Sequence, residues 1–110
     1  MRNKIQKGRV ITVFAPYAVS GGMGVLVGAL FGIAAGDAAN GAPVEIDREG
    51  VFDIAAVTAD AAAQGAKVYW DNAARKITTT AAGNTLVGAL TAAKTGAESV
   101  ARVCLDGVIR

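Results

Sequence analysis

One segment has nearly the residues and spacing of a phosphate-binding loop. Residues 88–95, with the sequence GALTAAKT, match the pattern G-x-x-x-x-G-K-[ST] except that Ala93 stands where the pattern has its second glycine. That glycine lets backbone amides wrap around phosphate groups, and a helix has to follow the loop. Gly96 would interrupt such a helix almost at once. We therefore do not expect nucleotide hydrolysis here, and nucleotide binding is kept only as a distant alternative.

The other side chains that could perform chemistry lack suitable partners. The sequence contains no histidine, which excludes Ser-His-Asp and Cys-His catalytic arrangements and most mixed zinc sites. The single cysteine, Cys104, lies in an apolar run and is expected to be a small core residue. Asp47 and Glu49 are two residues apart and would share one face of a solvated edge strand. We expect no catalytic residue, no metal site and no cofactor.

Basic residues are concentrated at the N-terminus. Of the 11 basic residues, four lie among the first ten positions, whereas all 9 acidic residues lie further along the chain. These four are Arg2, Lys4, Lys7 and Arg9. The distribution predicts an extended basic arm at residues 1–9 and a single domain at residues 10–110. Three interpretations of the arm stay open: a solvated tail, a segment that docks on an acidic protein surface, or a nucleic-acid contact.

A membrane helix is an alternative for the next part of the chain. Residues 10–36 contain no charged side chain and are long enough to span a bilayer. Glycine recurs at every fourth position from Gly24 to Gly36, which would give a helix a stripe of small residues. Pro16 and the Ser-Gly-Gly sequence at 20–22 argue against a continuous helix. A small membrane protein with a helix at about 18–36 therefore remains the second choice.

Read as strands, the same residues fit a small β domain. The chain has 110 residues and only 5% aromatic residues, so any core is thin. We expect strands at 10–14 and 25–30, with 31–35 continuing the second strand. The pentapeptide LVGAL occurs at 26–30 and again at 86–90, which suggests two similar hairpins. The sequence predicts an all-β barrel or sandwich of short antiparallel strands, with at most one short helix.

The middle of the chain contains that one expected helical turn and a further hairpin. Residues 58–64 could form a turn of helix that is capped by Thr58 and ended by Gly65. Residues 67–71 and 76–80 would then pair around a turn. Tyr69 and Trp70 are adjacent on the first of these strands, so one ring should fill the core and the other should lie at the surface. Both are candidate residues for self-association, and the sequence does not say which ring is outside.

Taken together, these segments resemble the head decoration, or cement, proteins of tailed bacteriophages. The resemblance covers nearly the whole chain, and its most specific piece is Val68-Tyr69-Trp70-Asp71 followed by a threonine-rich strand and Gly83-Asn84. Further matching pieces are residues 3–8, Ala15-Pro16, 27–34, 49–52, 65–67 and 85–88.

The resemblance implies a structural protein without enzymatic activity. It implies binding of the major capsid protein on the outer surface of an expanded head, self-association as a homotrimer, assembly in the host cytoplasm, and no direct binding of nucleic acid or membrane. The candidate capsid-binding residues are those of the arm: Arg2, Lys4, Ile5, Lys7 and Arg9. We expect the arm to be mobile in the free protein and to become ordered on the capsid.

Overall fold

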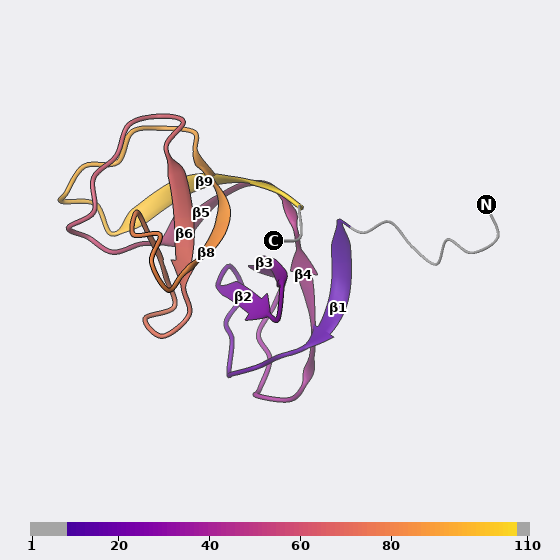
Figure 1. Ribbon diagram of the computed structural model, residues 1–110. Coiled ribbons are helices and arrows are strands. Elements are labelled where there is room, and N and C mark those ends of the chain that lie inside the picture. The colour runs from indigo at the N-terminus through magenta and orange to yellow at the C-terminus, as the bar shows by residue number, and fades with distance from the viewer. Residues whose placement is uncertain (1–8, 108–110) are drawn as a thin grey trace.

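The computed structural model describes residues 9–107 and consists of β-strands joined by turns (Figure 1). The strands are β1 (Val10–Phe14), β2 (Gly24–Val27), β3 (Leu30–Ala34), β4 (Pro43–Asp47), β5 (Glu49–Ala55), β6 (Lys67–Asp71), β7 (Lys76–Thr78), β8 (Thr85–Leu90) and β9 (Val100–Asp106). All strand pairings in the two sheets are antiparallel. The predicted all-β class is confirmed, and no helix occurs in residues 9–107.

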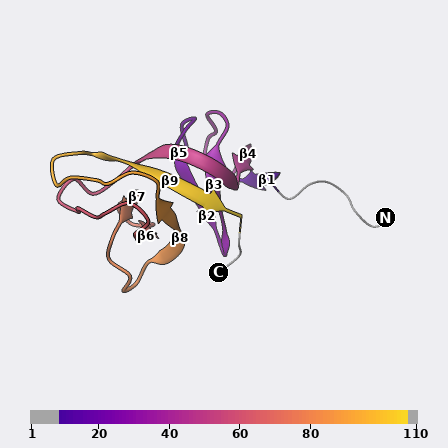
Figure 2. The same cartoon turned by 90° about the horizontal axis from the view of Figure 1, so that it is seen from above.

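The strands form two sheets that follow one another along the chain. The N-terminal sheet has the strand order β1-β4-β3-β2, and the C-terminal sheet has the order β5-β9-β8-β6-β7. Seen from above, the C-terminal sheet lies on one side and β1 lies at the far side of the N-terminal sheet (Figure 2). The single residue Arg48 separates β4 from β5, so the chain passes from one sheet to the other at this corner.

The C-terminal sheet curls until its two edges meet. Ala56, just after β5, forms a parallel bridge with Ile77 of β7, and the amide of Val57 donates to the Ile77 carbonyl at 2.9 Å. This closure covers part of both edge strands and leaves a small interior for side chains. The interior is filled by buried residues from every strand of the sheet: Ile54, Ala56, Val68, Trp70, Ile77, Val87, Leu90, Ala101, Val103 and Leu105.

The N-terminal sheet has a second, smaller core. Its members are Ala15, Tyr17, Val19, Val25, Ala34, Val44 and Ile46, which come from the strands and from the loop after β1. Alternation along β4 explains the pattern, because Val44 and Ile46 are buried whereas Pro43 and Glu45 are exposed. Ile33 of β3 belongs to the other core, so this strand connects the two sheets.

Several expectations for local structure are wrong. Residues 25–35 form a hairpin instead of one long strand, because the chain reverses at Gly28, whose φ is +59°. The second LVGAL copy lies within the continuous strand β8, so the repeat does not build two equivalent hairpins. Residues 58–64 form turns and one bridge, Ala62 with Lys94, instead of a helical turn. The membrane-helix alternative for 18–36 is also wrong, since β2 and β3 occupy that segment.

Cys104 is a further correction. It lies on β9, where Val103 and Leu105 point inward and are buried, so the alternation of the strand places Cys104 on the outer face, where it is exposed. An apolar sequence context was therefore misleading about this side chain. Within residues 9–107, no helix is long and apolar enough to cross a membrane, and no group of acidic residues and cysteine is placed to hold a metal ion.

Gly88 is the glycine that the packing of two strands requires most directly. A Cβ atom at this position would lie 2.2 Å from the carbonyl oxygen of Cys104 on the neighbouring strand β9. We expect Gly88→Ala to lower the free energy of unfolding by about 1–3 kcal/mol, because β8 and β9 would have to separate. Gly36→Ala is the matched control, since a Cβ there meets nothing within 4 Å and its φ is not positive. Equal urea midpoints for the two variants would contradict this account of Gly88.

Candidate interaction site at the start of the first strand

The place where the N-terminal segment enters the fold is fixed mainly by backbone contacts. The carbonyl of Arg9 accepts a hydrogen bond from the amide of Arg48 at 2.7 Å. Val10 then pairs with Asp47, so β1 begins at the corner between β4 and β5. Arg9 therefore has a defined position, next to the passage between the two sheets.

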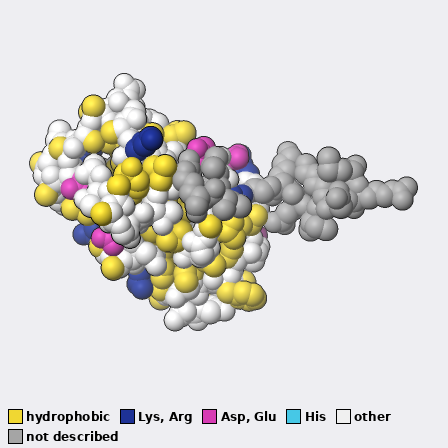
Figure 3. All heavy atoms as spheres, in the orientation of Figure 1, with side chains coloured by type: hydrophobic (Ala, Val, Ile, Leu, Met, Phe, Trp, Pro, Cys, Tyr) yellow, Lys and Arg dark blue, Asp and Glu magenta, His cyan; other side chains and the backbone are white. Residues whose placement is uncertain are grey.

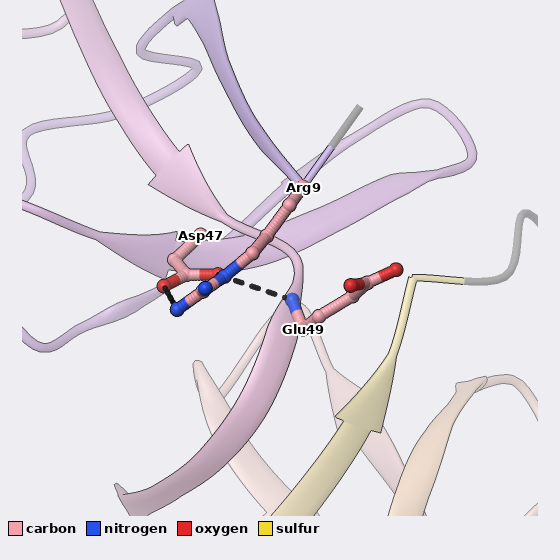
Figure 4. Close-up of polar contacts among 3 residues, drawn as sticks. All are labelled: Arg9, Asp47 and Glu49. Carbon is pink, nitrogen blue, oxygen red and sulfur yellow. Dashed lines mark hydrogen bonds and ion pairs between the residues drawn. The ribbon is translucent and has the colours of Figure 1, made fainter. Parts of the chain in front are cut away.

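Arg9 also makes an ion pair at this corner. Its guanidinium nitrogens Nε and Nη2 lie 3.4 Å from the two carboxylate oxygens of Asp47, and Asp47 Oδ1 accepts the amide of Glu49 at 3.2 Å (Figure 4). The Arg9 side chain is 61% exposed, so we expect this pair to contribute little to stability. The ion pair nevertheless gives the Arg9 guanidinium a partner within its own chain. Acidic and basic side chains gather on the surface near this corner (Figure 3).

The structure describes one of the five predicted arm residues. Arg9 lies at the start of β1 as described above, whereas Arg2, Lys4, Ile5 and Lys7 lie outside the described residues. The expected mobility of the arm, and its ordering on a partner, fall on the same undescribed segment. These assignments therefore stay predictions.

The two adjacent rings of β6 are placed as the alternation predicts, one inside and one outside. Trp70 is 1% exposed, whereas Tyr69 is partly exposed on the outer face of the C-terminal sheet. Trp70 packs beside Phe31, with ring centroids 5.2 Å apart, and its Nε1 donates to Asn72 Oδ1 at 3.0 Å. A Cβ atom at Gly24 would lie 2.7 Å from this indole ring. Trp70 therefore joins the two sheets, and Tyr69 is the ring that reaches the surface.

A second contact between the sheets was missed in the sequence. Arg75, in the turn between β6 and β7, places its guanidinium carbon 3.9 Å from the centre of the Tyr17 ring. The Tyr17 hydroxyl donates to the carbonyl of Gly24 at 2.9 Å, and burial raises the pKa of this hydroxyl. The cation–π contact holds the turn between β6 and β7 against the core of the N-terminal sheet. Nothing in the spacing of residues 17 and 75 indicates this pairing.

Large apolar side chains remain at the surface in two places. On the N-terminal sheet, Val10 is 40% exposed and Phe14 is 71% exposed. On the C-terminal sheet, Val51 is 55% exposed and Val100 is 45% exposed, and Val51 lies opposite the exposed Cys104. Figure 3 shows hydrophobic side chains exposed at the surface, with few charged side chains among them. These side chains lie singly, so their exposure alone does not mark a binding surface.

Comparison with known protein families identifies the chain. The sequence model of one family, described as phage cement protein, matches residues 5–105. The chain belongs to the phage cement protein family. No curated protein and no solved structure matches it. The match includes Ile5, Lys7 and Arg9 of the predicted arm together with β1 through most of β9. Membership gives the protein a structural role in the phage capsid and confirms the resemblance seen in the sequence.

The cement protein uses the lysine of the phosphate-loop pattern for its own structure. Lys94 is only 6% exposed, and its Nζ donates to the carbonyls of Thr58 at 3.1 Å, Asp60 at 2.5 Å and Thr95 at 3.1 Å. All three donors of the ammonium group therefore bind backbone oxygens. The lysine is held away from any phosphate that could approach segment 88–95, which removes the main support for the nucleotide alternative.

Asp60 extends this loop cluster of the cement protein. Its Oδ2 accepts the Thr78 hydroxyl at 2.7 Å and the Thr79 amide at 3.0 Å. These two hydrogen bonds favour the ionised carboxylate and lower the pKa of Asp60. The cluster formed by Lys94, Asp60 and Thr78, called the loop cluster below, thus ties the segment after β5 to the strand β7 and to the loop before β9.

The lowered pKa of Asp60 predicts a specific acid sensitivity. A carboxyl group with a depressed folded-state pKa stabilises the fold above its unfolded pKa of about 4, and this stabilisation is lost as the pH falls through the folded pKa. We expect the free energy of unfolding of Asp60→Asn, measured by urea denaturation, to differ less between pH 7 and pH 3 than that of the unaltered protein. Asp37→Asn serves as a control at an exposed carboxylate that also accepts a backbone amide, from Gly21. The same acid dependence in Asp60→Asn and the unaltered protein would contradict the assignment.

Proposed function

We propose that this cement protein binds the outer surface of the expanded phage head at junctions between major capsid subunits. There it would hold the subunits together against the pressure of the packaged DNA. The observation that carries the proposal is the family match over residues 5–105, which gives the chain a capsid role. The resemblance adds the outer surface, the expanded state of the head and the junctions between subunits.

The basic arm is the proposed capsid-binding segment. Its residues Arg2, Lys4, Ile5 and Lys7 precede a strand whose position is fixed by the backbone contact between Arg9 and Arg48. A segment anchored at one end can reach an acidic surface on a neighbour and add contact area at an entropic cost. Many copies on a closed shell then turn modest contacts into strong overall attachment.

Self-association as a homotrimer is part of the proposal. Exposed apolar side chains on both sheets, together with Tyr69 on the outer face of β6, supply surface that another copy can cover. The proposed partners are the major capsid protein and further copies of this chain, without direct contact with nucleic acid or membrane. Assembly is proposed to take place in the cytoplasm of the bacterial host, with the mature protein in the virion.

Sedimentation with purified heads tests the proposed binding. We expect the protein to sediment with expanded heads at a fixed ratio to the major capsid protein, and to remain in the supernatant with unexpanded shells. A gel-shift assay with duplex DNA at two salt concentrations serves as the comparison, because a nucleic-acid contact would give a strongly salt-dependent shift. A DNA shift without sedimentation on heads would overturn the proposal in favour of nucleic-acid binding.

A further inference from the structure

The outer face of the C-terminal sheet contains an apolar groove. It has a volume of about 280 Å³ and is lined by Lys67, Leu86, Gly88, Ala89, Cys104 and Asp106. The register explains its floor, because Ala89 of β8 lies directly opposite Cys104 of β9, and both are small. Leu86 forms one wall, beside the irregularity where β6 and β8 shift register. The groove is therefore a feature of the strand pairing and does not depend on a loop.

The N-terminal sheet presents a complementary projection. Phe14, at the end of β1, is 71% exposed, the largest exposed fraction among the exposed large hydrophobic residues of the described chain. It pairs with Pro43, and the exposed Glu45 lies two residues further along β4 on the same face. The projection thus combines an aromatic ring with a nearby negative charge. The groove has an apolar floor with Lys67 on its β6 rim and Asp106 on its β9 rim, so a negative charge beside the inserted ring is favoured only on the β6 side.

We propose that Phe14 of one copy inserts into this groove of a second copy, with Glu45 facing Lys67. The two surfaces lie on different sheets, and β1 is on the opposite side of the molecule from β6 and β8 in both views, so a chain does not fill its own groove (Figures 1 and 2). Such a contact joins different patches of two identical chains. A head-to-tail contact of this kind closes into a ring when its rotation permits. An aromatic anchor in a pocket is the type of residue that dominates interface energies.

The inference rests on the proposed self-association and names the contact that would produce the homotrimer. It does not depend on how the arm binds the capsid. It also gives Cys104 a use as a reporter, because the thiol lies in the groove and is the only cysteine of the chain.

Disulfide trapping tests the contact. Phe14→Cys places a second thiol on the projection, and mild oxidation of the protein in solution and on decorated heads should give a ladder that ends at three chains on a non-reducing gel. Phe14→Cys combined with Cys104→Ser is the control and should not give this ladder. Cross-linking of the unaltered protein through Cys104 alone into dimers, or no ladder from Phe14→Cys in either setting, would overturn the contact.

Light scattering adds an independent readout. We expect Phe14→Ala to raise the concentration at which the trimer dissociates by about tenfold or more. The urea midpoint of the monomeric chain should not change, because the Phe14 side chain is exposed there. Glu45→Lys and Lys67→Glu should each weaken association, and the double variant should restore it. A trimer that is unaffected by the three single variants would refute the contact while self-association stands. A monomer at every concentration and on heads would refute both, and sedimentation on heads would still test capsid binding separately.

Discussion

Deletion of residues 1–8 is expected to weaken binding to expanded heads by about tenfold or more, with little effect on the stability of the domain. The deletion removes Arg2, Lys4 and Lys7, and exposed ion pairs contribute roughly 0.2–1 kcal/mol each, where 1.4 kcal/mol corresponds to tenfold in affinity. The deletion also removes the apolar side chain of Ile5. The domain keeps the contact between the Arg9 carbonyl and the Arg48 amide, which fixes the start of β1.

Charge and chain length can be separated in the same experiment. Replacement of Arg2, Lys4 and Lys7 by glutamine keeps the arm and removes its charge, and its effect should shrink as salt is added, since salt screens exposed charges. Lys76→Gln, at an exposed position in β7, is the matched control for the loss of a positive charge elsewhere. Equal binding of the truncated and the full-length protein, measured by sedimentation with heads, would refute the role of the arm.

Lys94→Met is expected to lower the free energy of unfolding by about 2–4 kcal/mol, because it removes three hydrogen bonds from a charged donor to partly buried backbone carbonyls. The methionine side chain fills much of the same space, so the loss reports on the ammonium group of Lys94 more than on packing. The carbonyls of Thr58 and Asp60 belong to the segment after β5, and that of Thr95 belongs to the loop before β9. Urea denaturation followed by tryptophan fluorescence measures the effect, since Trp70 is buried in the same sheet.

Lys76→Met provides the comparison for Lys94→Met. Lys76 lies at the start of β7 and is exposed, so the same substitution there should change the free energy of unfolding by less than about 0.5 kcal/mol. Similar losses for both variants would show that the loop cluster does not depend on the Lys94 ammonium group.

The sequence was informative where alternation and turn residues agree. The strands near 10–14 and 67–71 follow from alternating side chains, and the all-β class follows from them. The placement of one β6 ring inside and one outside also follows from alternation. That Trp70 is the inner ring does not follow, because it depends on Gly24 and Phe31 in the other sheet.

Identical local sequences took different structures because their neighbours differ. In LVGAL at 26–30, Gly28 has a φ of +59° and makes the turn of a hairpin. In the second copy, Gly88 is pressed against the backbone of β9 and stays in a strand. Glycine permits both conformations, so the pairing partner decides between them. A pattern limited to one segment cannot contain that information.

The features most relevant to the site were also set by distant parts of the chain. Lys94 matches a phosphate loop in sequence, but its ammonium group binds two carbonyls of the segment after β5 and the carbonyl of its neighbour Thr95. Cys104 looked like a core residue because its neighbours are apolar, although alternation along β9 alone predicts the opposite face once Val103 is known to be inside. The basic arm is inferred from the charge distribution of the first ten residues and stays a prediction.

Imaging of expanded heads that lack this protein, after incubation with the purified chain, tests the central claim most directly. The account predicts density at repeated positions on the outer surface, between major capsid subunits, with residues 1–8 traced onto a capsid subunit and the groove at Cys104 covered by a second copy. Bare heads beside unbound protein, under conditions where the protein is folded and in excess, would contradict it.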